Sequence, residues 1–298
     1  MDQSFVFEIM YGFACFLIAV SVVLFGIYFY EWTTPVRLKV ELSEKDNPAL
    51  GVNLMGYVIG LMLLVMGAIS TDSGNLPQFL DIGIFGFLAV LLLRVGATVT
   101  DKLILPTFSI WKELIDDQNV GTGFVTASVF IATGAILKGS LTGDSSGILM
   151  GILTTLEYFV FSQVIVAIAA FIYTILIKYE HKDGKSLSVQ EELRDKNNPA
   201  VGLSFGGFIV GVSIVVSAAI DGNDITSLAD LSWVLGILTI SSILGIGTMI
   251  LIHSFTDKAV FPYASVNSEI GEQQNLAIGG MYAAFYIGFG LILYKLIA

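Results

Sequence analysis

The sequence predicts an all-α, polytopic membrane protein with eight transmembrane helices. Of its 298 residues, 55% are hydrophobic and 13% are charged, whereas a soluble domain carries about 25% charged residues. Eight apolar runs are also long enough for a bilayer, which takes about 20 residues of helix. These runs are residues 11–30, 49–69, 79–100, 121–141, 156–178, 200–220, 232–254 and 276–297. A soluble α-helical protein is disfavoured, because it would have to cover these helices with amphipathic ones, which are few.

The first apolar run is expected to stay in the protein as a helix. The residues before it, MDQSFVFEIM, contain no Lys or Arg, whereas a signal peptide starts with basic residues. Cys15 lies inside this run and is the single cysteine of the sequence, so an internal disulfide is excluded.

The loops predict the orientation of the helices. Most Lys and Arg residues lie in the loops inside each helix pair, which are residues 31–48, 101–120, 179–199 and 255–275. The loops between pairs contain none, and these are residues 70–78, 142–155 and 221–231. Because basic loops stay in the cytoplasm, we expect the within-pair loops there and both termini outside, in a bacterial inner membrane. The formal net charge of −11 comes largely from loop acids, and no nucleic-acid partner is expected.

Each within-pair loop ends in the same motif, which indicates an internal repeat. The copies are ELSEKDNPALG at 41–51, ELIDDQNVGTG at 113–123, ELRDKNNPAVG at 192–202 and EIGEQQNLAIG at 269–279. Each copy has Glu first, Asn seventh and Gly eleventh, so the shared residues are Glu41, Asn47 and Gly51; Glu113, Asn119 and Gly123; Glu192, Asn198 and Gly202; and Glu269, Asn275 and Gly279. Four copies in register predict four two-helix hairpins that enter the membrane with the same polarity.

The helix after each motif carries two small residues four positions apart. The pairs are Gly56 and Gly60, Ser128 and Ala132, Gly207 and Gly211, and Ala284 and Gly288. Small residues at this spacing let helix backbones approach closely in lipid. Asn is a favoured N-cap because its side-chain oxygen accepts an orphan backbone N–H. The motif therefore predicts capped starts for four tightly packed helices.

The copies alternate, which predicts a duplicated four-helix half. The first and third copies contain Asn-Pro, and the second and fourth follow DKLILP at 101–106 and DKAVFP at 257–262. The A-B-A-B pattern divides the chain into halves 1–150 and 151–298, with two-helix units at 1–70, 79–141, 156–220 and 232–298. Units of equal polarity are related by an axis along the membrane normal. The sequence leaves open whether they form a pseudo-fourfold ring or two facing bundles.

Arg94 is the strongest candidate for a residue on an ion path. It lies within the third apolar run, where the other copies have Val22, Tyr173 and Ile250. A charge inside a span costs about 2.5–3.5 kcal/mol on insertion scales. By sign, Arg94 could pair with Glu157 or Asp81; the alternatives are backbone carbonyls as partners, or a side chain that reaches the membrane surface.

Other polar residues complete the candidate set. Asn53 is a candidate lining residue of an ion path, and Glu157 is a further ion-path or buried-charge candidate. The repeated cytoplasmic loop acids Asp101 and Asp257 are also candidates. Solvated loop residues are the alternative interpretation of the two acids. We expect His253 to lie at the membrane interface.

The motifs resemble those of a bacterial membrane family called domain of unknown function 350. The resemblance rests on an acid before Ile or Leu, a following Asn and a helix rich in small residues, as in NNPAVGLSFGGFIVG at 197–211 and LPTFSIWKELIDDQNV at 105–120. It covers nearly the whole chain and implies a fused tandem of the common four-helix form. The second and fourth copies depart most, with Val120 and Leu276 in place of proline. The resemblance implies an architecture rather than an activity.

The leading functional hypothesis is a channel or transporter-like pathway for a small inorganic ion, based on the parallel repeats and Arg94. The alternative is a non-conducting scaffold that binds a cytoplasmic protein partner in an envelope-stress system, based on the charged loops. A membrane enzyme acting on lipids is disfavoured, because the sequence has no HExxH, GxSxG, Walker A or CxxC motif. With two His and one Cys, no metal site or cofactor is expected. A homo-oligomer in the lipid bilayer is compatible with the sequence.

Overall fold

The protein is a bundle of long helices. The computed structural model describes residues 3–70, 78–141, 147–221, 228–262 and 265–298, so parts of the predicted loops 70–78, 142–155 and 221–231 lie outside the described residues. Eight helices in the described ranges are long and apolar enough to cross a membrane. They are α1 (Gln3–Thr33), α2 (Pro48–Ser70), α3 (Gln78–Val99), α4 (Val120–Gly139), α5 (Ile148–Leu176), α7 (Pro199–Ala218), α8 (Leu228–Ala259) and α10 (Leu276–Ile297). The predicted multi-pass helical fold is confirmed.

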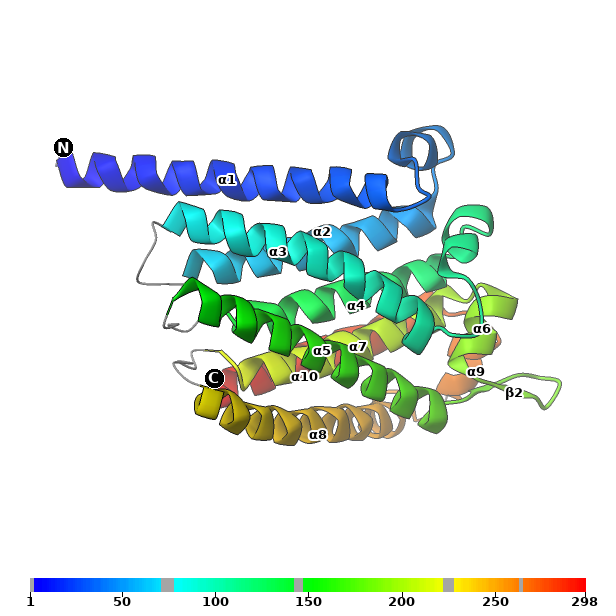
Figure 1. Cartoon of the computed structure of the whole chain (residues 1–298). Helices are drawn as coiled ribbons and strands as arrows, with labels where there is room; N and C mark the ends of the chain where they lie inside the picture. Colours follow the sequence, from blue (N-terminus) through cyan, green and yellow to red (C-terminus); the bar gives the residue numbers. More distant parts are fainter. Residues whose placement is uncertain (1–2, 71–77, 142–146, 222–227, 263–264) are drawn as a thin grey trace.

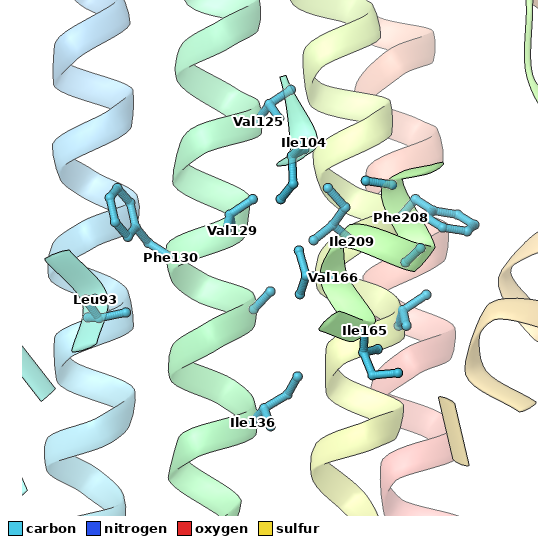
Figure 2. Packing of buried hydrophobic residues seen from close by; sticks show 14 of the residues in the cluster. Leu93, Ile104, Val125, Val129, Phe130, Ile136, Ile165, Val166, Phe208 and Ile209 are labelled. Carbon is cyan, nitrogen blue, oxygen red and sulfur yellow. The ribbon is translucent and has the colours of Figure 1, made fainter. Parts of the chain in front are cut away.

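The eight helices form two layers (Figure 1). The inner layer is a row in which α2 packs on α4, α4 on α7 and α7 on α10 (Figure 2). The outer layer contains α1, α3, α5 and α8, and its helices α3, α5 and α8 each pack on the inner helix of the preceding unit. The inner row is open, with α2 and α10 at its two ends. This arrangement is neither of the two that the sequence left open, the ring and the facing bundles.

The four within-pair loops gather at one end of the bundle, and both termini lie at the other (Figure 1). We call the loop end the motif end; whether it faces the cytoplasm stays a prediction. Its short elements are the π-helical turns η1 (Val40–Glu44), η2 (Thr100–Ile104) and η3 (Lys112–Asp116), the helices α6 (Val189–Lys196) and α9 (Val266–Gly271), and the strands β1 (Tyr179–Glu180) and β2 (Ser186–Leu187). The two strands pair antiparallel, with Tyr179 opposite Leu187.

Helix α6 shows how the sequence sets these short elements. The Ser188 side chain accepts a hydrogen bond from the N–H of Glu191, and the Glu191 carboxylate accepts one from the N–H of Ser188. This reciprocal capping satisfies two backbone donors that a helix start leaves unpaired. The helix ends at Asn197, which adopts the left-handed conformation with φ of 50°.

The inner row is held by direct backbone contact at small residues. A Cβ atom placed on Gly56 would lie 2.3 Å from the Cα of Ala127, and one placed on Gly207 would lie 2.4 Å from the Cα of Ala283. Five further glycines predicted to pack helices also face a neighbouring backbone: Gly60, Gly123, Gly202, Gly211 and Gly279. Small side chains let the helices approach this closely, which is a main source of helix association in lipid.

Two of the predicted packing glycines do not contact another helix. A Cβ on Gly51 would meet only the Leu42 side chain, at 3.9 Å, and one on Gly288 would meet no atom within 4 Å. The packing prediction for these two residues is therefore corrected for the described chain. Both lie on the outward faces of the terminal helices α2 and α10, where the row ends.

Apolar side chains fill the space between the layers. Val129 of α4 and Ile209 of α7 lie near Val166 of α5 and Ile104 of η2 (Figure 2). All four side chains are less than a tenth exposed. The outer helices therefore pack on the closely packed inner row, and this packing fixes the positions of their polar side chains.

Candidate functional site

The repeated motif forms the same backbone joint four times at the motif end. In each copy the N–H of the Asn donates to the carbonyl of the Glu six residues earlier, at 2.9 Å for Asn47, 2.8 Å for Asn119, 3.2 Å for Asn198 and 2.9 Å for Asn275. The residue before each Asn has φ between 47° and 51°, and these residues are Asp46, Gln118, Asn197 and Gln274. A left-handed residue of this kind ends one helix so that the next can begin.

The Asn side chain binds both sides of this joint. The Oδ1 of Asn198 accepts from the N–H groups of Ala200 and Val201, which caps α7 as predicted from sequence. In all four copies the Nδ2 donates to the motif Glu carboxylate, at 3.0, 2.7, 2.8 and 3.0 Å in chain order. The first three carboxylates are buried, with 5% of Glu41, 3% of Glu113 and 0% of Glu192 exposed. Buried charges need such donors, which explains the Glu–Asn pairing structurally.

The same Asn amides also join consecutive units. Asn47 donates to the carbonyl of Leu114 at 2.8 Å, Asn119 to that of Leu193 at 2.7 Å, and Asn198 to that of Ile270 at 2.8 Å. Each acceptor directly follows the motif Glu of the next unit. One Asn side chain therefore caps a helix start, donates a hydrogen bond to a carboxylate and fixes the position of the neighbouring unit.

His181 adds an ionic link between the third and fourth copies. Its Nδ1 lies 2.8 Å from the Glu272 carboxylate, and its Nε2 hydrogen-bonds to Glu192. The side chain is 9% exposed. The hydrogen bond to Glu192, together with the one to Glu272, raises the pKa of His181 above its ordinary value. The pKa of Glu272 is lowered, chiefly by its bond to His181. The sequence offered no signal for this residue, because the hairpin that positions it occurs in one copy alone.

The neighbouring Glu residues differ in their charge environment. Burial raises the pKa of Glu113, and the bond from Asn119 offsets part of this effect. Burial also acts on Glu41, but hydrogen bonds from Lys45 and Asn47 outweigh it and lower the pKa of that carboxyl. The Lys45 ammonium lies 2.7 Å from Glu41. The joint can thus hold a carboxylate with or without a cation beside it.

Arg94 borders a polar cavity between the layers. Its Nε donates to the Thr33 hydroxyl at 2.9 Å and its Nη2 to the Thr33 carbonyl at 2.8 Å. Its guanidinium carbon lies 5.9 Å from the centre of the Trp111 ring, in cation–π range. No Asp or Glu among the described residues forms an ion pair with it. The backbone carbonyl partner, which was one of the alternatives from the sequence, is therefore confirmed. The pairing of Arg94 with Glu157 or Asp81, which was suggested by opposite charge, is wrong.

The cavity beside Arg94 has a volume of about 80 Å³. Two other predicted site residues, Asn53 and Asp101, contribute to its wall. Asn53 is part of a hydrogen-bonded chain, because it accepts from the Tyr30 hydroxyl at 2.5 Å and donates to Thr126 at 2.7 Å. Asp101 accepts from the N–H of Ile110 at 3.2 Å. The structure thus brings together three of the five predicted ion-path residues and adds Tyr30, which sequence reasoning missed.

The second half has a related polar cluster at the corresponding place. Tyr173, like Tyr30, lies three residues before the end of its helix, and its hydroxyl is 3.0 Å from Ser204, the counterpart of Asn53. Tyr173 is therefore the counterpart of Tyr30, not of Arg94. The sequence alignment was wrong here because the β1–β2 hairpin lengthens the following loop.

His253 and Asp257 supply the ionisable groups of this second cluster. The Nδ1 of His253 is 2.6 Å from the Tyr286 hydroxyl, and its Nε2 is 3.8 Å from Asp257, which also accepts from Tyr282. His253 is 13% exposed, so its side chain packs against neighbouring helices; its expected place at the membrane interface stays a prediction. The sequence signal that could have identified His253 as part of the cluster is its position four residues before the repeated Asp257. Glu157 lies on α5 and lines neither this cluster nor the Arg94 cavity.

Comparison with known proteins agrees with this architecture. A family model described as Domain of Unknown Function (DUF350) matches residues 4–141 and again residues 147–297. The chain belongs to this family. A relative described as a UPF0719 transmembrane protein from Aquifex aeolicus (strain VF5) is 25% identical over 280 residues, which cover 93% of this chain and 97% of the relative. No solved structure matches the chain. The further division of each DUF350 match into two helix pairs stays our interpretation, and the fourfold Glu–Asn joint supports it.

Proposed function

We propose that this DUF350 protein conducts a small inorganic ion across the bacterial inner membrane, and that the ion binds at Arg94. The observation that carries the proposal is the guanidinium that borders a polar cavity without a carboxylate partner among the described residues. A fixed positive charge in a path favours anions. A cavity of about 80 Å³ also has room for several waters, since one water needs about 10–15 Å³. The Asp101 carboxylate in the same wall accepts from the N–H of Ile110, and Arg94 is the cation that faces the cavity, so the expected ion is a small anion such as chloride.

The packing favours a path between the layers. The inner helices touch backbone to backbone, as at Gly56 and Gly207, which leaves no room for an ion between them. The Arg94 cavity instead lies among α1, α3 and the inner helices α2 and α4. In the second half, the His253–Asp257 cluster occupies the corresponding place and offers titratable groups, which are common in proton-coupled membrane proteins.

The test is an anion flux assay in proteoliposomes. The purified protein should release chloride down a gradient when a potassium ionophore balances the charge, and Arg94→Leu should lower the flux at least about tenfold, which corresponds to about 1.4 kcal/mol. Arg94→Lys should keep part of it, because the charge remains. Arg37→Leu is the matched control, since Arg37 is an exposed arginine at the motif end. Absence of flux for anions and cations in every gradient would remove the proposal.

The scaffold alternative is favoured by a different observation. The β1–β2 hairpin extends beyond the bundle at the motif end (Figure 1), and its tip carries the exposed residues Lys182, Asp183 and Lys185. Such a projecting charged loop suits a soluble protein partner. A stable complex that is captured through residues 179–199 and lost when the three tip residues are changed to Ser, with no ion flux by the same preparation, would support the scaffold.

A further inference from the structure

The three contacts within the inner row use the same two faces of each helix. Positions along each inner helix are counted as the number of residues after the motif Asn. The front face contains the second, ninth and thirteenth residues after it. The rear face contains the fourth, eighth, eleventh and fifteenth residues. Gly56, at the ninth position of α2, meets Ala127, at the eighth of α4, and Gly207 meets Ala283 in the same way between α7 and α10. The row is thus built by repeating one front-to-rear contact.

The fourth and second positions repeat in the same way. A Cβ on Gly123 would lie 2.6 Å from the carbonyl oxygen of Ala49, and one on Gly279 would lie 2.5 Å from that of Ala200. In α7 a Cβ on the corresponding Gly202 would lie 2.2 Å from the carbonyl oxygen of Gly121. The cross-unit Asn bonds run in the same direction, each from one unit to the next along the row.

Both ends of the row present an unused half of this contact. On α10 the front-face residues Ala277 and Ala284 are exposed, and Gly288 faces open space. On α2 the rear-face residues Met55 and Met62 are 51% and 49% exposed. Their counterparts at the three internal contacts are buried in every case except Ser128, which is half-buried.

The hydrogen-bond pattern is unfinished at the same place. Asn275 donates to Glu269 within its own copy, and among the described residues it does not reach a carbonyl of another unit, as Asn47, Asn119 and Asn198 each do. Its burial differs accordingly, because Asn275 is partly exposed while the other three are at most 2% exposed.

We propose that a second copy of this chain completes the row. The front face of α10 in one copy would pack on the rear face of α2 in the next, and Asn275 would donate to the carbonyl of the partner's Leu42. Leu42 directly follows the motif Glu41, as Leu114, Leu193 and Ile270 follow theirs. The copies keep the same polarity in the membrane, as the units do. A head-to-tail contact of this kind builds a closed ring or an open row.

The shapes of the two faces fit this contact. The front face of α10 carries small residues, and the rear face of α2 carries methionines where the internal contacts have Ala, Gly or Ser. Flexible methionine side chains fill irregular grooves well. The contact between copies is therefore wider than the internal ones, and its side chains interlock in place of direct backbone contact.

The outer helix α1 provides an independent argument. Each other outer helix packs on the inner helix of the preceding unit, as α3 does on α2 and α8 on α7. For α1 this preceding helix would be α10 of the partner. Within one chain 11% of the α1 span is buried, and for α10 the figure is 28%, against 89% for α7. A second copy would cover both helices at once.

Disulfide cross-linking between differently tagged copies tests the proposal. In a Cys15→Ser background, one copy carries Ala284→Cys and the other Met55→Cys, and both are expressed together and oxidised in membranes. A disulfide forms only when the Cβ atoms come within about 3.5–4.5 Å, so we expect a cross-linked pair that contains both tags. Ala277→Cys with Gly51→Cys is the second pair, at the second and fourth positions.

Ile168→Cys, paired with Ala284→Cys, is the matched control. Ile168 is an exposed residue eight positions from the motif end of α5, the distance of Ala284 from the start of α10. Equal yields for the control and the two test pairs would overturn the proposal, because random collision would then explain the link. Cross-linking of a single variant with itself, without the mixed product, would indicate a symmetric contact and also overturn it. Native mass spectrometry that finds only single chains with bound lipid, with no cross-link for either pair, would assign both faces to lipid.

Asn275→Ala tests the hydrogen bond in the same assay. Loss of one bond worth about 1 kcal/mol should lower the association constant about fivefold. Gly288→Leu should lower it further by placing a large side chain in the contact, while thermal unfolding of the single chain stays unchanged because a Cβ on Gly288 meets no atom within 4 Å. An unchanged yield in both variants would contradict the proposed faces.

Discussion

At the scale of single residues, the motif Asn determines how the units are joined. Its oxygen caps a helix, and its amide binds both a buried carboxylate and the backbone of the next unit, as in Asn198. Each of these roles needs a planar amide with an acceptor and two donors. Asp would place a second negative charge beside the buried Glu192. This requirement explains why Asn is the residue that recurs in all four copies.

Substitution of this residue should be costly inside the row and mild at its end. Asn198→Ala removes a cap worth about 1 kcal/mol and leaves the buried Glu192 short of a donor, at about 1–3 kcal/mol. We expect a loss of about 2–4 kcal/mol in the free energy of unfolding. Asn275→Ala should cost about 1 kcal/mol in the single chain, since Glu269 is partly exposed. Chemical denaturation in detergent measures both, and equal losses would contradict the cross-unit role of Asn198.

His181 should make stability depend on pH. Its folded-state pKa lies above the unfolded value of about 6.5, because the imidazolium can donate to Glu192 and Glu272 together. The stabilisation is therefore complete below about pH 6.5 and is lost as the pH rises through the raised pKa. The lowered pKa of Glu272 acts only in a more acidic range. We expect the melting temperature of the wild type to fall between about pH 6 and 9.

The variant His181→Gln isolates this effect, since Gln can donate from one end but does not titrate. Its melting temperature should lie below that of the wild type at pH 6 and approach it at pH 9. His253→Gln is a control at the other histidine, which does not contact Glu192. If His181→Gln keeps the slope of the wild type, another group controls the pH dependence.

At the scale of helices, small residues set the spacing of the inner row. A side chain on Gly207 has no room, because its Cβ alone would lie 2.4 Å from the Cα of Ala283. Gly207→Leu should force α7 and α10 apart and cost about 3 kcal/mol or more. The matched control is Gly247→Leu on α8, where a Cβ meets no atom within 4 Å. We expect a low yield of monodisperse protein for the first and a normal yield for the second. Normal folding of Gly207→Leu would show that close packing is not the reason for the glycine.

The helices and their caps could be predicted from the sequence because both follow from local requirements. A span needs about 20 apolar residues wherever it lies, and an N-cap such as Asn119 needs only its own helix. The partner of Arg94 could not be predicted in the same way. The sign of the charge pointed to Glu157, whereas the structure uses the Thr33 hydroxyl and carbonyl, which no charge pattern reveals.

At the scale of the molecule, repetition predicted four units of equal polarity but not their arrangement. Small-residue pairs identify helices that pack, but a ring and an open row use the same pairs. The difference lies in the angle between the front and rear faces, which depends on neighbouring positions such as Ala127 beside Ser128. His253 was missed for a similar reason, because its neighbours Tyr282 and Tyr286 come from another helix.

The contact between the two halves should survive a break in the chain. It repeats the contact found inside each half, because Gly202 meets Gly121 and Asn119 donates to Leu193. Residues 1–144 and 145–298, expressed together as separate chains, should therefore copurify in mild detergent. Gly202→Leu should abolish this, since its Cβ alone would lie 2.2 Å from the carbonyl oxygen of Gly121. Gly236→Leu on α8, where a Cβ meets nothing within 4 Å, should leave it intact. Copurification that persists in Gly202→Leu would mean that the outer helices hold the two halves together, and that the backbone contact between α4 and α7 is not needed for it.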